Sequence, residues 1–403
     1  MEPVSIVINE LRELWSGGNG PSLVAIASGW GILLGTRMIY PVLLPYFRDS
    51  YGLSLTIAGL LITILWLGSA VGQLPSGILA DRYDERRVMS VGAVIVALAL
   101  VSVVTAETPL ILFVGTGVVG LGLSLYPIAR ITMLTDIYPD RIGSALGVTM
   151  ATGDIGQTIL PPIAGLLAAA IAWQVGLGYV IPLLILIGVF IWVTLPAQHS
   201  SSSAVDSLSS ESVQTLLAEI RGSNLGFVSF ILFLFVLIWQ SFAGLYPTYL
   251  VEVKGLSSAA AGLLFSAYFA FGVIIKPLSG AAYDRIGMRR ALVMVLVGPV
   301  IGLIALPFIE GFWPLVGITA FVSMMLGSGA ITQSFLANSF SREIRGTGLG
   351  VIRTTVASLG AMGPVLFGGL ADRGYFDEGY LVLAGILVLV IILTLRLPKP
   401  SSS

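Results

Sequence analysis

Five ionisable side chains interrupt the long apolar stretches of this sequence: Arg37, Arg130, Asp154, Lys276 and Arg353. A charge near the centre of a membrane-spanning helix costs at least about 2.5–3.5 kcal/mol, so each of these residues is a candidate for a functional site. Four of them are cations and one is a carboxylate. Because guanidinium groups hold carboxylates and phosphates through paired hydrogen bonds, this set favours the binding of a small anion inside a membrane.

The candidates for contact with a bound solute are Arg37, Arg130, Arg353, Gln240 and Tyr40. We expect the anion to bridge Arg37 in the first half of the chain and Arg353 or the glutamine in the second. Asp154 is the candidate for taking up and releasing a proton, and its alternative role is counter-ion of Arg37. For Arg130 the alternative is a structural role beside Asp154 or helix carbonyls. For Lys276 and Arg353 the alternative is that the side chain extends to the membrane surface.

The composition indicates that lipid surrounds most of the chain. Hydrophobic residues make up 56% and charged residues 10%, against roughly 25% charged residues in an ordinary soluble domain. The chain has no cysteine and one histidine, so we expect no metal centre and no cofactor. A net charge of -1 without a basic cluster argues against nucleic acid as a partner. No Gly-x-x-x-x-Gly-Lys-Ser/Thr loop for ATP is present.

Apolar stretches of about 20 residues are long enough to cross hydrocarbon as helices. Twelve are predicted, at 22–46, 55–79, 88–105, 110–135, 143–171, 177–195, 225–250, 258–281, 290–309, 313–338, 347–370 and 380–397. The serine-rich residues between the sixth and seventh predict a flexible linker. The expected division is a cytoplasmic N-terminal segment at 1–21, a six-helix bundle at 22–195, the cytoplasmic linker at 196–222, a second six-helix bundle at 223–398 and a tail at 399–403.

One loop motif occurs twice, with the second copy 203 residues after the first. The first copy contains Gly77, Asp81, Arg82, Arg86 and Arg87, and the second contains Gly280, Asp284, Arg285, Arg289 and Arg290. The sequence Gly-Leu-Ser also recurs at this offset, at 52–54 and 255–257. Two parallel six-helix repeats create a pseudo-two-fold axis along the membrane normal, and a cavity between them can open to each side in turn.

The duplicated motif and the apolar stretches resemble those of the major facilitator superfamily over essentially the whole chain. The resemblance implies an all-α membrane protein in which twelve transmembrane helices form two pseudo-symmetric six-helix bundles. It also implies that the ten motif residues form a cytoplasmic gate, whose aspartates face helix starts in the other bundle and whose arginines pair across the cytoplasmic side. It places Arg37 and Arg130 on helices that line the cavity. The first copy of the motif departs from the pattern, because Asp84 stands where the second copy has Gly287.

The distribution of basic residues indicates the orientation in the membrane. Arginines and lysines gather in the predicted loops on one side, and acidic residues gather on the other. Because cytoplasmic loops are the ones enriched in basic residues, we expect a multi-pass protein of the cell membrane with both termini in the cytoplasm.

We expect secondary active transport of a small solute by alternating access, with an anion as the solute and protons as the coupling ions. The partners would be the solute, protons and the lipid bilayer, and the protein would act as a monomer. A multidrug efflux antiporter is the alternative within the same class. From another class, a non-transporting membrane receptor or an intramembrane enzyme stays open, but we expect no enzyme, because Asp154 is the one carboxylate inside the predicted spans.

Overall fold

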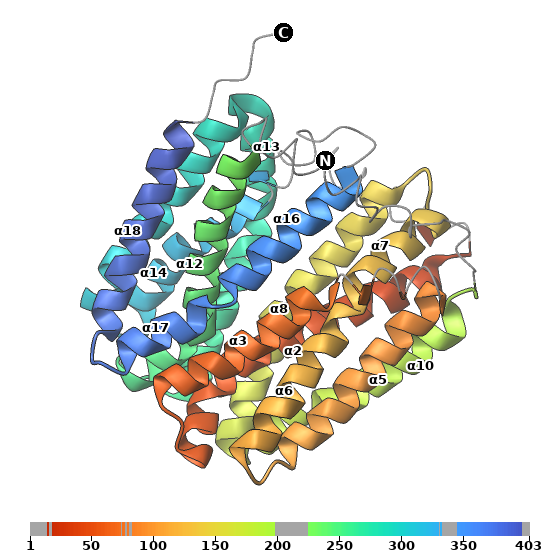
Figure 1. The fold of residues 1–403 in the computed structure, drawn as a ribbon, viewed down its shortest axis with the longest axis horizontal. Coiled ribbons are helices and arrows are strands. Elements are labelled where there is room, and N and C mark those ends of the chain that lie inside the picture. Colours follow the sequence, from red (N-terminus) through yellow and green to blue (C-terminus); the bar gives the residue numbers. More distant parts are fainter. Residues whose placement is uncertain are drawn as a thin grey trace.

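The computed structural model describes residues 14–15, 18–73, 75–76, 79, 83–197, 225–329, 331–332 and 345–396. Within these ranges every regular element is a helix (Figure 1). Eight helical stretches are apolar and long enough to cross a membrane, and two shorter apolar helices cover Leu55–Val71 and Phe312–Gly327. The prediction of an all-α membrane protein is therefore confirmed, whereas the count of twelve spans stays a prediction.

The helices fall into two groups along the chain. The first contains α2 (Gly20–Tyr51), α3 (Leu55–Val71), α5 (Glu85–Val104), α6 (Pro109–Ser124), α7 (Tyr126–Ile137), α8 (Ile142–Ala170), α9 (Trp173–Gly178) and α10 (Val180–Thr194). The second contains α12 (Leu225–Glu252), α13 (Ser258–Ala305), η2 (Leu306–Phe308), α14 (Phe312–Ser323), η3 (Met324–Gly327), α16 (Arg345–Gly360), α17 (Gly363–Ala371) and α18 (Phe376–Leu395).

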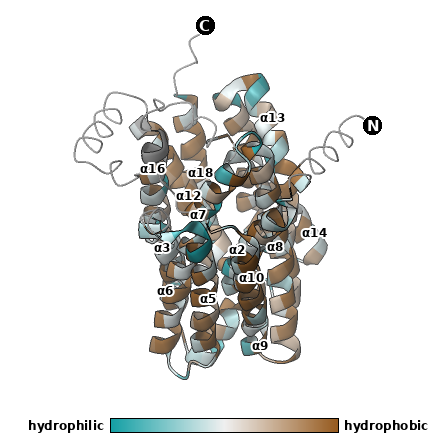
Figure 2. Cartoon of the chain, turned by 90° about the vertical axis from the view of Figure 1, so that its right-hand side faces the viewer, coloured by the Kyte–Doolittle hydropathy of each residue, from teal (hydrophilic) through white to brown (hydrophobic). Residues whose placement is uncertain are grey.

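Figure 1 shows the first group on one side of the molecule and the second on the other. The two groups, called the N-half and the C-half below, meet where α3 packs on α16 and α17, α8 on α13, and α2 on α12. Figure 2 shows apolar residues along α5 and α10 and hydrophilic residues at the tip of α13. Large apolar side chains such as Leu98 and Val193 are exposed on these outer helices, as expected for surfaces that face lipid.

The long helix α13 contains a bend at Gly287, whose φ of 76° and ψ of 166° are not helical. A side chain at Gly272 would meet Leu326, and a side chain at Gly298 would meet Met324. These two glycines would lie about 39 Å apart along a straight helix at about 1.5 Å per residue. Because both contact the short η3 element, α13 folds back at Gly287 and contributes two antiparallel segments.

Asp84 and its repeat counterpart Gly287 both have a positive φ angle. The φ angle is 82° at Asp84 and 76° at Gly287. A positive φ is uncommon for residues other than glycine, and the Asp84 side chain accepts a hydrogen bond of 3.0 Å from the backbone N–H of Arg86. It therefore caps the start of α5. The residue at this position of the motif therefore has a positive φ in both repeats.

Glycines allow α2 and α8 to pack backbone against backbone. A Cβ atom on Gly156 would lie 1.9 Å from the carbonyl oxygen of Gly31, and a Cβ atom on Gly35 would lie 2.5 Å from the carbonyl oxygen of Gly156. Small residues permit this kind of close approach between membrane helices. The contact fixes the relative position of the helices that carry Arg37 and Asp154, two of the candidate site residues.

Candidate functional site

An ion pair joins the two halves near the middle of their helices. Lys276 on α13 lies with its Nζ atom 2.5 Å from Oδ1 of Asp154 on α8. The same oxygen accepts a longer hydrogen bond of 3.4 Å from Nε2 of Gln157. Asp154 is therefore the counter-ion of Lys276, and the alternative that pairs it with Arg37 is wrong in this structure. The alternative that Lys276 extends to the membrane surface is also wrong, because its ammonium group binds a carboxylate at mid-helix.

Arg37 lies beside a pair of stacked indoles that also crosses between the halves. Its guanidinium carbon is 5.3 Å from the centre of the Trp66 ring. Trp66 on α3 stacks on Trp239 of α12, with ring centres 5.7 Å apart and planes 14° apart. Among the described residues, no hydrogen-bond partner is found for Arg37 Nε or for either indole Nε1. Buried polar groups are seldom left without a partner, so Arg37 Nε and Trp66 Nε1 are donors available to a further group.

Arg130 is buried against the side chains of its own half. Its guanidinium carbon lies 4.2 Å from the centre of the Trp30 ring, and its Nη1 atom donates a hydrogen bond to Thr149 Oγ1. The described contacts of Arg130 do not include Asp154, and the role of Arg130 stays a prediction. Arg353 of α16, in the C-half, lies close enough to repel the charge of Arg130. The two cations belong to opposite halves.

Arg353, Gln240 and Tyr40 have different surroundings. The Arg353 side chain is exposed although it lies in the middle of α16. Gln240 is 2% exposed, and its Oε1 atom has no hydrogen-bond partner among the described residues. Tyr40 is fully buried, and its hydroxyl accepts a hydrogen bond of 3.5 Å from Thr116 on α6. Gln240 thus offers a free acceptor, whereas Tyr40 is held inside the N-half.

The halves are also joined at the end of the molecule that carries Arg48, called the Arg48 end. Asp372, which follows α17, accepts hydrogen bonds of 2.7 Å from the backbone N–H groups of Leu55 and Thr56 at the start of α3. It also accepts a hydrogen bond from the Thr56 hydroxyl. Arg48 forms an ion pair with Glu252 across the same interface. The backbone packs closely here as well, since a Cβ atom on residue 368 would lie 2.3 Å from the Leu55 carbonyl oxygen.

A carboxylate at a helix start meets the positive end of the helix and its unpaired N–H groups. Burial alone would raise the pKa of Asp372, but the hydrogen bonds from Thr56, Ser54 and Leu55 outweigh burial and hold this pKa below its ordinary value of 3.8. Asp372 is therefore charged at neutral pH. Sequence reasoning missed this contact, because the two partners lie 317 residues apart and nothing local in the sequence pairs them.

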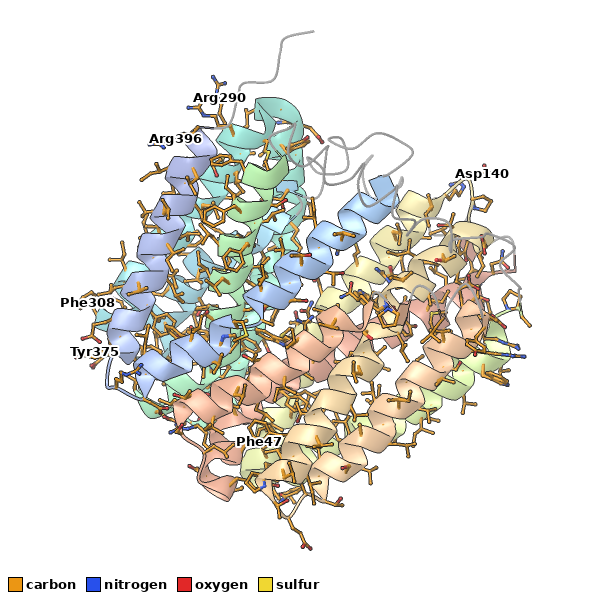
Figure 3. The ribbon with its side chains drawn as sticks, viewed as in Figure 1. Phe47, Asp140, Arg290, Phe308, Tyr375 and Arg396 are labelled. Carbon is orange, nitrogen blue, oxygen red and sulfur yellow. The ribbon has the colours of Figure 1, made fainter. Side chains whose placement is uncertain are left out.

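The described residues of the duplicated loops lie at the opposite end, where Figure 3 shows Asp140, Arg290 and Arg396. This is called the Arg290 end. Arg86 stacks on Trp192 with its guanidinium carbon 4.7 Å from the ring centre. Its Nη1 atom donates hydrogen bonds of 3.4 Å to the carbonyl oxygens of Trp192 and Leu195. Arg86 therefore binds the end of α10 in its own half rather than the other half.

The structure describes some of the other gate residues and not others. Gly77, Asp81 and Arg82 lie outside the described residues. The residues Arg87, Gly280, Asp284, Arg285, Arg289 and Arg290 lie at the Arg290 end, and Arg87, Asp284, Arg285 and Arg290 among them are exposed. The pairing of motif residues across the two halves stays a prediction.

Comparison with known proteins agrees with this architecture. The sequence profile described as Major Facilitator Superfamily matches residues 25–362 and 228–403. The chain is 23% identical over 394 residues to a hexuronate transporter of Bacillus subtilis, covering 90% of this chain and 91% of that protein. It is 24% identical over 356 residues to a cis,cis-muconate transport protein of Acinetobacter baylyi, covering 83% and 84%.

Solved structures have the same fold. A crystal structure of the nucleoside transporter NupG superimposes with a TM-score of 0.80 at 14% sequence identity, covering 94% of this chain and 100% of that chain. A bacterial homologue of the human lysosomal transporter Spinster, in an inward-facing and occupied conformation, superimposes with a TM-score of 0.74 at 16% identity, covering 93% and 95%. The chain is a multi-pass membrane transporter rather than an enzyme, and it belongs to the major facilitator superfamily.

Proposed function

We propose that this protein is a secondary active transporter that carries a small organic anion across the cell membrane by alternating access, coupled to protons. The observation that carries the proposal is the charge balance at mid-membrane. Lys276 is neutralised by Asp154, which leaves Arg37, Arg130 and Arg353 without a carboxylate partner among the described contacts. Uncompensated cations in a low-dielectric environment attract an anion strongly.

The placement of these arginines fits a solute that draws the halves together. Arg37 and Arg130 belong to the N-half and Arg353 belongs to the C-half, and the repulsion between Arg130 and Arg353 would be relieved by an anion between them. Two relatives that cover most of the chain are named for the organic acids hexuronate and cis,cis-muconate. Another relative, the sialic acid transporter NanX of Escherichia coli, is 25% identical over 394 residues.

The same proposal assigns a conformation and an orientation. Arg86, Arg87, Arg285, Arg289 and Arg290 share the Arg290 end, and an excess of basic residues marks the cytoplasmic side. The Arg48 end would then face the outside. Because Asp372, Arg48 and the close backbone contacts join the halves at the Arg48 end, the structure corresponds to a carrier closed to the outside.

Uptake into proteoliposomes that contain the purified full chain tests the anion proposal. We expect radiolabelled glucuronate, sialate or muconate to accumulate when the outside is acidic. Arg37→Gln should lower uptake about 10- to 100-fold, because a hydrogen bond to a charged group is worth about 1.5–3 kcal/mol. Arg37→Lys should recover part of the loss, because it keeps the charge but not the paired donors.

Arg373→Gln is the matched control for these variants. Arg373 is exposed at the Arg48 end and donates to the carbonyl oxygen of Gly369 in α17, the helix that precedes it, so its loss should leave uptake unchanged. If wild-type protein transports lipophilic dyes instead, and Arg37→Gln transports them equally well, the multidrug efflux alternative replaces the anion proposal.

A further inference from the structure

Two guanidinium groups of the N-half each lie over an indole ring. The guanidinium carbon of Arg37 is 5.3 Å from the centre of the Trp66 ring, and that of Arg130 is 4.2 Å from the centre of the Trp30 ring. In both arginines the Nε atom is buried and has no hydrogen-bond partner among the described residues. An aromatic face holds the cation while the donors at the edge of the guanidinium plane stay available. The N-half therefore has two similar positions for an anionic group.

Helix α2 sets the distance between these two positions. It carries Arg37 itself and also Trp30, the residue over which Arg130 lies. Residues seven apart in a helix lie on nearly the same face, and at about 1.5 Å per residue they are separated by about 10 Å along the axis. The two guanidinium groups therefore lie at different depths along one face of α2.

A solute can reach this face of α2. Between residues 29 and 45 the partly exposed side chains are Trp30, Ile32, Leu34 and Arg37, and the others are buried. The first, third and fourth of these have the spacing i, i+4 and i+7 of a single helix face. Because α2 packs against α3, α8 and α10 of its own half and against α12 and α13 of the other, its exposed face lies inside the molecule.

We propose that the solute is a linear dicarboxylate with an apolar spacer, and that it binds with one carboxylate at Arg37 and the other at Arg130. This inference rests on the proposed anion transport. A charge-assisted hydrogen bond spans about 2.7–2.9 Å. Two such bonds leave about 5 Å of the 10 Å between the arginines for the distance between the carboxylates. A benzene ring or the chain of adipate separates two carboxylates by a similar distance.

Charge balance also favours a doubly charged solute. Lys276 is neutralised by Asp154, whereas the described contacts of Arg37, Arg130 and Arg353 include no carboxylate. A monocarboxylate would leave two of these three cations uncompensated, and a dicarboxylate would leave one. Uncompensated charges away from bulk water are costly. Arg353 also lies close enough to repel Arg130, so a carboxylate between them would contact a cation from each half.

The side chain between the two positions determines the middle of the solute. Leu34 lies between Trp30 and Arg37 on the exposed face of α2 and offers no hydrogen bond. A hydroxyl group placed beside it would lose water without gaining a partner. Glucuronate and sialate, which have one carboxylate and several hydroxyl groups, should therefore bind more weakly than muconate, which has two carboxylates and no hydroxyl group.

Binding of matched acids to the purified full chain tests the second position. Terephthalate has two carboxylates, and 4-carbamoylbenzoate has the same shape with a neutral amide in place of one of them. In calorimetric titrations of wild-type protein, terephthalate should bind about 10- to 100-fold more tightly, as expected for one additional hydrogen-bonded charge. Isophthalate has the same charge as terephthalate but a shorter spacing, so it should bind more weakly.

Two variants separate recognition from folding. In Arg130→Gln the affinity for terephthalate should fall to that for 4-carbamoylbenzoate, which can still use Arg37 and should bind almost as in wild type. Arg37→Gln should give the same result, because the monoacid can then use Arg130. A general loss of folding would weaken both acids by the same factor. Lys254→Gln is the matched control, because Lys254 binds the carbonyl oxygen of Pro307 near the Arg48 end, and the ratio of affinities should be unchanged.

A comparison of adipate with glucarate tests the apolar spacer, since the two chains have the same length and glucarate adds hydroxyl groups. Adipate should bind more tightly. Equal affinity of wild-type protein for terephthalate and 4-carbamoylbenzoate, or for terephthalate and isophthalate, overturns the dicarboxylate inference alone. Glucarate that binds as tightly as adipate overturns the apolar spacer. Absence of binding and flux for every tested anion overturns the proposed function and this inference together.

Discussion

Asp372→Asn should weaken the contact between the halves at the Arg48 end and favour the state open on that side. The substitution keeps the shape of the side chain but removes the charge that faces the start of α3. The asparagine can present its oxygen to one of the two backbone N–H groups that now bind the carboxylate at 2.7 Å. Its NH2 group then points toward the other N–H group, and that N–H group loses its partner.

The expected magnitude follows from the partners and from exposure. A hydrogen bond to a charged group contributes about 1.5–3 kcal/mol when buried, and a carboxylate at an exposed helix start contributes about 0.3–1 kcal/mol. Asp372 is exposed, so solvent screening brings the total toward the lower values. We take about 1 kcal/mol, which shifts the equilibrium between closed and open states about fivefold.

Cysteine labelling can measure this shift directly, because the chain has no cysteine of its own. Ile62→Cys places a thiol on α3 at the interface, where Ile62 faces Gly244 of α12 and is fully buried. A membrane-impermeant maleimide added from the Arg48 side can reach this thiol when the halves separate there. Adding Asp372→Asn should raise the labelling rate about fivefold.

Asp377→Asn provides the control at the same end. Asp377 accepts a hydrogen bond of 2.6 Å from the Tyr249 hydroxyl, and both residues belong to the C-half, so labelling of Ile62→Cys should not change. Equal labelling rates with and without Asp372→Asn, in protein of normal thermal stability, would show that the carboxylate does not hold the closed state.

The pH dependence has a definite sign. The pKa of Asp372 in the folded protein lies below its ordinary value of 3.8. The contact is therefore complete above the ordinary carboxyl pKa and is lost only as the pH falls through the lower, folded value. The difference in labelling rate between proteins with Asp372 and with Asn at this position should therefore be constant between about pH 5 and about pH 8. A wild-type rate that rises in this window and is flat in Asp372→Asn would contradict the pKa argument.

Three further substitutions test other contacts. Arg48→Gln removes the ion pair with Glu252, whose side chains are 20% and 31% exposed, and should raise labelling of the same thiol by less than Asp372→Asn, because such pairs contribute about 0–1 kcal/mol. Asp84→Ala should lower the thermal stability by about 1–2 kcal/mol more than Asp84→Gly, since alanine disfavours a positive φ. Gly156→Ala should reduce the yield of folded protein, because its Cβ atom would lie 1.9 Å from the Gly31 carbonyl oxygen.

The fold was largely predictable from the sequence, because its main signals are long apolar runs and an exact repeat offset. The five mid-membrane charges were also visible, since a charge stands out in an apolar run. Their partners were not visible. Lys276 and Asp154 are 122 residues apart in the sequence. Nothing in the local sequence indicates that Asp154 pairs with Lys276 rather than with Arg37. Which side chains meet depends on how the two halves dock, and the pattern of each helix alone does not contain that information.

The residues that agree between the repeats and those that differ have different roles in the structure. Glycines at equivalent positions shape equivalent contacts: a Cβ atom on Gly165 would lie 3.3 Å from the Ser258 carbonyl oxygen, and one on Gly368 would lie 2.3 Å from that of Leu55. These contacts occur in both repeats and bring the halves together in the same way on both sides of the pseudo-two-fold axis.

Outside the duplicated loop motif, two charged residues of the candidate site and of the contact between the halves are not repeated. Asp372 corresponds to Ala169 in the other repeat, and Arg37 corresponds to Gln240. A symmetric pair of bundles would bind a symmetric ligand and close with equal strength along both helix pairs. If the proposed function is correct, charges placed in one copy alone give the site between the halves a direction, so that a solute with one acidic end would meet the Arg37 guanidinium group on one side and the Gln240 amide on the other.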